Sequence, residues 1–295
     1  MEFTQAITVT DIQKKFKGFT LDIPQCRIPK GFATALIGEN GAGKTTFLNI
    51  LAGLRLDFQG NVEYFDEKET NVEAAKERLG YTGPGNFFLP HWNIQQVKEV
   101  SKLLFDNFHE DRFEQLCSDL GIGNGDMRKK VSSLSDGNQM KLTLASVFAR
   151  DTECLLMDEP ASPLDPLMRE KLCEMIREYI AEGNGERSVF FSTHNISDME
   201  YVTDYCMIME HGNIVEEGFV EDLKEKYVLV KGEAQDAEAA KKILYSFNGN
   251  QYGYEGICLA KDLDKLAGMD VHMDTPSLFQ ISVAVMKANT NLKMK

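Results

Sequence analysis

Short apolar runs separated by longer amphipathic stretches extend through most of the chain. The runs 32–37, 154–157, 188–191 and 207–210 are mostly apolar, which is typical of strands buried on both faces of a parallel sheet. Helical periodicity and turn residues alternate with these runs as far as residue 227. The pattern predicts an α/β fold with a doubly wound sheet.

The first 31 residues have a different pattern. Apolar and polar residues alternate over 7–10, 19–23 and 27–28. Pro24 and the Pro-Lys-Gly triplet at 29–31 are expected to break these segments. The alternation predicts an antiparallel β-layer that packs beside the α/β core.

Residues 93–121 have helical periodicity with two successive apolar faces. The predicted faces consist of Ile94, Val97, Val100, Leu103, Leu104 and Phe108, and then of Phe113, Leu116 and Leu120. An aromatic cluster at 87–92 precedes this helical segment. The cluster is a docking patch for a partner helix if it is exposed, and ordinary core if it is buried; the sequence leaves both open.

Beyond Tyr227 the pattern changes to that of a small α+β unit. The predicted strands are 228–230 and 256–260, and the predicted helices are 236–247 and 276–287. We therefore expect a main domain over residues 1–227 and a small C-terminal domain over 228–295. The second domain has no catalytic pattern, which favours a structural, dimerising or regulatory role.

Residues 38–45 match G-x-x-x-x-G-K-[ST], a glycine-rich loop that cradles nucleotide phosphates. The loop follows a predicted strand and precedes a helix expected at 45–54. Glycines let backbone N–H groups approach phosphate oxygens, and the helix N-terminus favours the same anion. Lys44 is expected to reach the β- and γ-phosphates, and Thr45 to ligate Mg²⁺. The candidate nucleotide-binding residues are Gly38, Asn40, Gly41, Ala42, Gly43, Lys44, Thr45 and Thr46.

Two acidic residues follow the apolar run 154–157. Asp158 is expected at the carboxyl end of a buried strand, where open α/β sheets bind their ligands. In that position Asp158 would hold Mg²⁺ through its water shell, and Glu159 would polarise the attacking water. Together with the glycine-rich loop, these carboxylates predict a nucleotide-hydrolysing site.

Shortly before the acidic strand lies Leu134-Ser135-Asp136-Gly137-Asn138, followed by an amphipathic helix predicted at 139–150. With these motifs the sequence resembles the ATP-binding subunit of ABC transporters, whose signature is Leu-Ser-Gly-Gly-Gln. The resemblance implies a P-loop NTPase core with an antiparallel β-layer, a helical subdomain over about residues 87–150 that leans on the transporter, and a small C-terminal α+β tail.

The signature departs from the family pattern at Asp136 and Asn138. The resemblance implies that Ser135 and Gly137 contact the γ-phosphate bound to a second subunit. A carboxylate at Asp136 opposes anion binding and is expected to weaken closure on a second copy. A structural role as a helix cap is the alternative for Ser135 or Asp136, and both roles are compatible.

Three further residues are assigned by the resemblance. Asp165 matches the aspartate of the loop that crosses the dimer interface, and Phe16 matches the aromatic residue that stacks on adenine. His194 matches the switch histidine that touches the γ-phosphate and braces Glu159. A satisfied polar core residue is the alternative for His194. Phe19 competes with Phe16 for the adenine, and a core role is the alternative for either ring.

The glutamine that in this family ligates Mg²⁺ and relays nucleotide state to the membrane partner is missing. Its expected position falls at Pro84, which has no side-chain acceptor. Water is a possible replacement, because Mg²⁺ tolerates a mostly hydrated shell. Asn86 is a second possible replacement if the loop bends far enough. We expect weaker retention of Mg²⁺ or altered coupling, without loss of hydrolysis.

Composition narrows the class of protein further. The 295 residues, 43% of them hydrophobic, suffice for a full α/β core with an appendage, and no apolar stretch approaches the roughly 20 residues that span a bilayer. A net charge of −14 disfavours nucleic acid and anionic lipid as partners. The N-terminus has no signal-peptide pattern. Six cysteines without a C-x-x-C pair indicate buried, reduced thiols.

The resemblance implies an Mg²⁺-dependent ATPase that powers an ABC transporter. Two copies, or this chain and a paralogue, would close head to tail on two ATP molecules. A polytopic membrane subunit on a separate chain would hold the protein at the cytoplasmic face of the membrane. The tail looks like that of some exporter ATPases of the ABC-2 kind, which leads us to expect export of a peptide, drug or other amphipathic substrate.

Two alternatives remain open. The first is the ATPase of an importer. The second is a soluble ABC protein that acts on ribosomes or DNA without a membrane partner. A single set of motifs, no long coiled-coil insertion and the acidic charge disfavour the second alternative.

Overall fold

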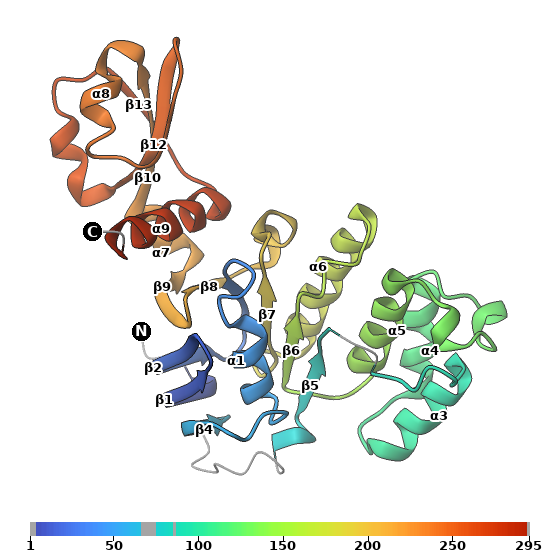
Figure 1. Ribbon diagram of the computed structural model, residues 1–295. Coiled ribbons are helices and arrows are strands. Elements are labelled where there is room, and N and C mark those ends of the chain that lie inside the picture. Colours follow the sequence, from blue (N-terminus) through green and yellow to red (C-terminus); the bar gives the residue numbers. More distant parts are fainter. Residues whose placement is uncertain (1–3, 66–74, 85–86, 294–295) are drawn as a thin grey trace.

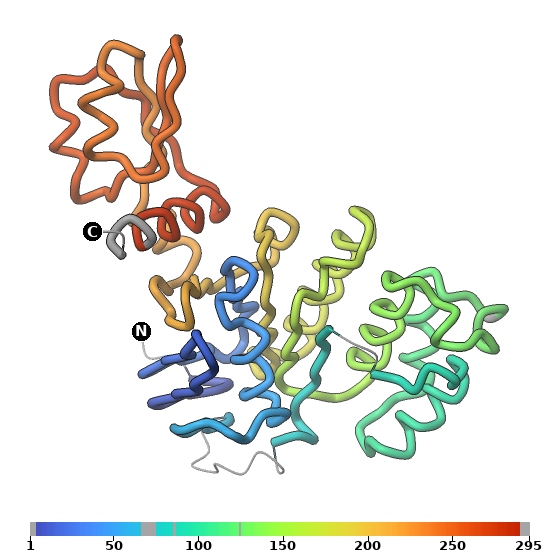
Figure 2. The backbone as a smooth tube through the Cα atoms, in the orientation of Figure 1, coloured from blue at the N-terminus to red at the C-terminus, as the bar shows by residue number. Residues whose placement is uncertain are grey.

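The computed structural model describes residues 4–65, 75–84 and 87–293. Figure 1 shows a central α/β body with a small antiparallel sheet at one side, a group of helices at the other, and a C-terminal unit above. The chain path in Figure 2 returns at its end from that unit toward the α/β body. The predicted fold class, a P-loop α/β core with a β-layer, a helical subdomain and an α+β tail, is confirmed.

Among the described residues, the central sheet has six strands in the order β5-β6-β7-β3-β8-β9. Its strands are β3 (Ala33–Ile37), β5 (Leu79–Thr82), β6 (Cys154–Asp158), β7 (Ser188–Thr193), β8 (Tyr205–Glu210) and β9 (Asn213–Phe219). The strands β5, β6, β7, β3 and β8 are parallel, and β9 pairs antiparallel with β8. All residues of β3, β6 and β7 are buried, which explains their nearly continuous apolar sequence.

Helices cover both faces of this sheet, and alternate strand residues enter different cores. Leu156 lies in the cluster that includes α1 (Lys44–Leu51), whereas Leu155 lies in the cluster that includes α6 (Pro166–Glu182). The prediction that the first helix extends to Leu54 is wrong. The chain leaves the helix at Gly53, whose φ of +65° lies in the left-handed region, and Leu54 is exposed.

The predicted N-terminal β-layer is present as an antiparallel sheet. Its described strands are β1 (Gln5–Phe16), β2 (Phe19–Pro29) and β4 (Gln59–Tyr64), in the order β2-β1-β4. The expectation that Pro24 breaks the segment is wrong, because β2 runs through it. Proline is tolerated there because β2 is an edge strand, which does not need every N–H for pairing.

The helical subdomain contains α3 (Ile94–Leu104), α4 (Glu110–Asp119) and α5 (Asp136–Phe148). Asn93 and Gln96 form a reciprocal capping box that begins α3. The helix predicted at 139–150 begins earlier, because Ser135 caps it. Leu103 and Leu104, which were predicted to share one apolar face with Ile94 and Val97, are 83% and 62% exposed. The neighbouring helices cover only the face of α3 that carries Ile94 and Val97.

The C-terminal unit is an antiparallel sheet in the order β11-β12-β10-β13, with short helices. Its described elements are β10 (Tyr227–Glu233), α8 (Ala237–Ala240), β11 (Tyr245–Gly249), β12 (Gly253–Leu259) and β13 (Val271–Asp274), and it follows α7 (Val220–Lys226). Of the helix predicted at 236–247, only Ala237–Ala240 is α-helical, and the prediction is wrong for the residues of β11. Tyr245 pairs with Ile257 in the sheet, and Phe247 stacks on Tyr254, so strand pairing overrides the helical pattern.

The last helix, α9 (Leu278–Lys293), joins the C-terminal unit to the α/β body. In Figure 1 it lies between the C-terminal sheet and α7. Leu278 and Ile281 are fully buried and belong to the same hydrophobic cluster as Leu155 and Met157 of β6. The boundary expected at residue 227 therefore marks a change of architecture, while the chain beyond it contributes side chains to the main core.

The described part of the chain has no helix that is both long and apolar enough to span a membrane. All six cysteines are buried and none forms a disulfide. Burial raises the pKa of the Cys117 and Cys154 thiols to about 12, so both remain protonated at neutral pH.

Replacing Ile281 by alanine should lower the free energy of unfolding by about 2–5 kcal/mol, because it leaves a cavity where α9 meets the main core. Urea denaturation of the full chain measures this loss. Phe279→Ala on the same helix is the matched control, because its side chain is 44% exposed, and it should cost much less. Equal losses in the two variants would contradict the proposed packing of α9.

Candidate functional site

The glycine-rich loop connects the buried strand β3 to α1, as its motif requires. Gly43 has a φ of +112°, and a Cβ on Gly38 would lie 2.4 Å from the carbonyl oxygen of Met209. Both positions therefore require glycine. A pocket of about 370 Å³ lies at the loop. It is lined by Phe16, Phe19, Glu39, Asn40, Gly41, Gly43, Lys44, Thr45, Thr46 and Glu159.

The pocket thus contains most of the predicted nucleotide-binding residues. Gly38 and Ala42 lie in the loop but do not line the pocket; Ala42 is buried, and its N–H donates to the Glu39 carbonyl oxygen at 3.1 Å. Phe16 and Phe19 both line it, with ring centroids 6.0 Å apart, and Phe16 is the more exposed of the two. Both rings therefore remain candidates to stack on an adenine base.

Lys44 is held over the loop by three oxygen partners. Its Nζ donates to the carbonyl oxygens of Gly38 and Glu39 at 2.7 and 3.3 Å, and it lies 3.3 Å from Glu159 Oε1. The side chain is only 6% exposed. A nearly buried ammonium beside backbone N–H groups and a helix N-terminus is a strong site for a phosphate anion.

The two acidic residues lie at the end of β6, next to β7. Asp158 is 1% exposed, and its Oδ1 accepts a hydrogen bond from Ser192 Oγ. The same hydroxyl oxygen accepts from the backbone N–H of Glu159 at 3.0 Å. Glu159 has a φ of +52°, which is strained for a residue with a side chain. Ser192 therefore fixes the bend that turns Glu159 toward the pocket.

His194 follows β7 and lies beside Glu159. Its Nδ1 is 2.7 Å from Glu159 Oε2, while Glu159 Oε1 faces Lys44. Each oxygen of the Glu159 carboxylate therefore has one basic neighbour. Three residues that are 115 and 35 positions apart along the chain thus meet, and two of them, Lys44 and Glu159, line the pocket.

A polar contact joins β5 to α1 near Asp158. Tyr81 donates its hydroxyl proton to Asn49 Oδ1 at 2.8 Å. Burial raises the pKa of Tyr81 above its usual range, and the negative charge of Asp158 raises it further. The hydroxyl therefore remains a hydrogen-bond donor at all physiological pH values.

Magnesium ion fits the donor set on this edge of the sheet. Asp158 Oδ2 is buried and has no hydrogen-bond partner among the residues that the structure describes. A buried carboxylate oxygen without a donor is costly unless a cation or water compensates it. Thr45, which carries a hydroxyl group, lines the neighbouring pocket. Hard oxygen donors of this kind, with space for water, suit Mg²⁺.

The signature residues lie apart from the glycine-rich loop. Ser135 caps α5, and its Oγ accepts from the backbone N–H of Asn138 at 3.4 Å. Ser135 and Gly137 do not line the pocket that contains Lys44. Of Ser135 and Asp136, the two residues considered as caps, Ser135 is the one that caps α5. Asp165 caps α6 by accepting from the N–H of Met168 at 3.1 Å.

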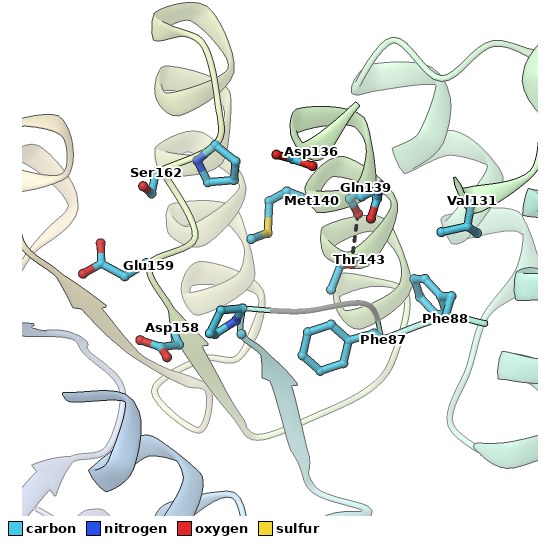
Figure 3. Close-up of a pocket in the computed structure, with 13 residues that line it drawn as sticks. Phe87, Phe88, Val131, Asp136, Gln139, Met140, Thr143, Asp158, Glu159 and Ser162 are labelled. Carbon is cyan, nitrogen blue, oxygen red and sulfur yellow. Dashed lines mark hydrogen bonds between the residues drawn. The ribbon is translucent and has the colours of Figure 1, made fainter. Parts of the chain in front are cut away.

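A second pocket, of about 360 Å³, separates the N-terminus of α5 from the acidic residues. Figure 3 shows Asp136 and Met140 of α5 on one side, with Asp158 and Glu159 on the other. Pro84 also lines it, exposed, at the position expected for the missing glutamine. Asn86, the alternative to that glutamine, lies outside the described residues.

An apolar groove of about 380 Å³ lies between the α/β body and the helical subdomain. Its apolar lining consists of Ala52, Leu54, Leu79, Tyr81, Phe87, Phe88, Trp92, Val100, Leu104, Phe105 and Val147. Phe87 and Leu104 are exposed by 42% and 62%, so part of the predicted aromatic cluster is accessible. The cluster is neither fully core nor fully surface, because Phe88 and Trp92 also pack against the main core.

Comparison with known proteins identifies the class. Residues 21–162 match the family model described as ABC transporter. Thiamine import ATP-binding protein of Haemophilus influenzae is 29% identical over 200 residues, which cover 65% of this chain and 91% of that protein. Tungstate uptake system ATP-binding protein of Peptoclostridium acidaminophilum is 28% identical, covering 72% of this chain and 99% of that protein.

A third relative is much longer. Human ATP-binding cassette sub-family A member 6 is 28% identical over 71% of this chain, and the match spans only 13% of the human protein. Among solved structures, an ATP-binding subunit of an ABC transporter has a TM-score of 0.66 at 20% identity, covering 74% of this chain and 92% of that chain. A dimeric bacterial ABC transporter cassette has a TM-score of 0.62 at 18% identity, covering 72% and 98%.

Residues 21–162 therefore form an ABC transporter ATP-binding domain of the ABC-type ATPases. The fold, the glycine-rich loop and the acidic strand end agree with this class. Sequence reasoning missed Ser192 as a site residue, although it stands next to Thr193 and His194. The sequence shows only a serine at the end of an apolar strand. The role of this serine becomes visible when the strand is paired with β6, because the pairing places it beside Asp158.

Replacing Ser192 by alanine should lower the free energy of unfolding by about 1–3 kcal/mol, because Asp158 and the Glu159 N–H both lose a buried partner. Thermal unfolding and ATP hydrolysis measure the loss and the displacement of Glu159. The exposed Ser197, five residues further on, provides the control Ser197→Ala, which should change neither quantity. A Ser192→Ala variant as stable and active as the unchanged protein would contradict the role of this hydroxyl.

Proposed function

We propose that this protein is the ATP-hydrolysing subunit of an ABC transporter. The observation that carries the proposal is the contact of Glu159, which lines the pocket, with both Lys44 at 3.3 Å and His194 at 2.7 Å. A carboxylate beside a phosphate-binding lysine is suited to orient water against a γ-phosphate. The histidine holds that carboxylate in place.

Each remaining residue has a proposed role in the same reaction. Loop N–H groups and Lys44 bind the phosphates of ATP, and Phe16 stacks on adenine. Thr45 and Asp158 would hold Mg²⁺, which neutralises charge on the phosphate oxygens when it is bound. Glu159 takes the proton from the attacking water, and His194 and Lys44 stabilise the charge that develops on the γ-phosphate.

A second ATP-binding subunit, either another copy or a paralogue, completes the site. Ser135 and Gly137 lie at the N-terminus of α5 and apart from their own chain's Lys44 pocket. This separation supports a role toward nucleotide held by another subunit, because a helix N-terminus attracts anions. Asp136, at the first turn of that helix, opposes the attraction and should make closure weaker than with glycine.

The second proposed partner is a polytopic membrane subunit that docks in the apolar groove and holds the ATPase at the cytoplasmic face of the membrane. The groove's exposed Phe87 and Leu104 support this, since a partner helix can cover them. ATP-driven closing and opening would shift the membrane subunit between two states through their different affinities for ATP.

The proposed direction of transport is export, on the likeness of the α+β tail to that of ABC-2 exporter ATPases. Import is the second candidate, because the two bacterial relatives are named for thiamine import and tungstate uptake. Transport of labelled substrate into or out of sealed vesicles that carry the assembled complex distinguishes the two directions.

Glu159→Gln should keep ATP binding and reduce hydrolysis by about 100-fold or more, because the general base is lost while the phosphate contacts remain. Phosphate release and binding of a fluorescent ATP analogue measure the two quantities separately. Lys44→Ala is the comparison, and it should weaken binding itself. Full turnover in the Glu159→Gln variant would exclude the assigned role.

Leu104→Glu should abolish recovery of the membrane subunit in a tagged pull-down from detergent-solubilised membranes, because it places a charge in the apolar groove. The neighbouring Leu103→Glu is the matched control. Leu103 is 83% exposed and does not line the groove, so the Leu103→Glu variant should still recover the membrane subunit. Mass spectrometry identifies the recovered protein. Loss of the partner in both variants, or in neither, would contradict docking at this groove.

A further inference from the structure

The segment that follows His194 lies between the proposed catalytic residues and the C-terminal unit. It forms two short 3-10 turns, Ile196–Asp198 and Glu200–Val202. Ile196 and Met199 are at most 1% exposed, so their positions are fixed by what packs on them. Arg169 of α6 is hydrogen-bonded to the first turn of the segment, and the same turn contacts α9.

Toward the catalytic site, one arginine connects the segment to the loop after Glu159. Arg169 donates from Nη1 to Asp198 Oδ2 at 2.7 Å and from Nε to the carbonyl oxygen of Leu164 at 2.9 Å. Asn195, the residue after His194, donates from Nδ2 to the same Asp198 oxygen at 2.8 Å. The planar guanidinium fixes both loops relative to each other. A displacement of Asp198 is therefore transmitted to the neighbour of His194.

Toward the C-terminal unit, the segment holds the first turn of α9. Glu200 Oε1 accepts the backbone N–H of Leu278 at 2.9 Å, and Lys224 of α7 lies 3.7 Å from the same oxygen. Ser277 and Gln280 satisfy each other's backbone N–H groups in a capping box. A carboxylate at a helix N-terminus is favoured by the helix dipole. Leu278 and Ile281 pack in the same cluster as Ile196 and Met199.

We propose that the C-terminal unit sets the position of His194 through this segment, with Glu200 as the positioning residue that connects α9 to it. The inference rests on the proposed function of His194 and Glu159. Movement of α9 would shift Glu200 and the buried Ile196 and Met199, and then the residues that adjoin His194. Anything that binds the C-terminal unit and displaces α9 would thereby change the rate of ATP hydrolysis without touching the nucleotide.

The experiment compares Glu200→Ala with Glu200→Gln in the full chain. The alanine variant removes the acceptor for the Leu278 N–H, whereas the glutamine oxygen retains it. Lys231→Ala is the control, because it breaks an exposed ion pair with Asp274 inside the C-terminal sheet, away from the segment. Steady-state kinetics give kcat and the KM for ATP, and hydrogen exchange with mass spectrometry reports on the peptide over residues 193–200. Thermal unfolding measures global stability.

Glu200→Ala should lower kcat by about three- to tenfold, with KM for ATP unchanged and faster exchange over 193–200. Glu200→Gln should restore at least half of kcat, and Lys231→Ala should match the unchanged protein. Unchanged kcat and exchange in Glu200→Ala would overturn the inference, as would a fall in Tm with no selective change in this peptide.

Hydrogen exchange also separates this inference from the proposed function. If the unchanged protein and Lys44→Ala are equally inactive toward ATP, the proposed function fails. The exchange of residues 193–200 in Glu200→Ala then still decides whether α9 controls the segment.

Discussion

The parallel register of β3, β6 and β7 is the constraint on which the site depends. Asp158 of β6 stands opposite Ser192 of β7, and Thr193 of β7 stands opposite Ile37 of β3. The glycine-rich loop, the two acidic residues and His194 therefore leave the sheet at the same level. A shift of one residue in either pairing would turn Asp158 or Ser192 to the opposite face and separate Glu159 from Lys44. The buried Ser192 hydroxyl fixes this register with two hydrogen bonds.

Glu159 illustrates how the surroundings hold a strained residue in a productive position. Its positive φ turns the carboxylate out of the line of β6, between Lys44 and His194. The strain is opposed by the hydrogen bond from its N–H to Ser192 and by basic partners on both oxygens. Two of the groups that position Glu159, Lys44 and His194, are also the groups proposed to contact the transferred phosphate.

The C-terminal unit is more closely integrated with the ATPase than its separate sheet suggests. The sheet has a small core of its own, which includes Val230, Tyr254 and Cys258. The final helix nevertheless buries Leu278 and Ile281 in the main core and is capped by Glu200. A unit attached in this way can bias the segment after His194, whereas a unit on a flexible linker could not.

The sequence by itself determined the chemistry of the site. Local patterns include the loop 38–45, the acids after residue 157 and the histidine after residue 193. Each of these segments follows a strand, and the apolar sequence of that strand predicts that it is buried. The β-layer was predicted in the same way from the alternation of apolar and polar residues, and the helical subdomain from helical periodicity. Tertiary structure decided what depends on residues far apart in the chain. No local pattern specifies the partners in these contacts. Examples are the contacts of Glu159 with Lys44 and His194, the hydrogen bond of Ser192 to Asp158, and the pairing of the strand at 245–249. The attachment of α9 to Glu200 also depends on tertiary structure. The amphipathic pattern of a helix predicts that one face is buried, but it does not specify the surface that covers this face.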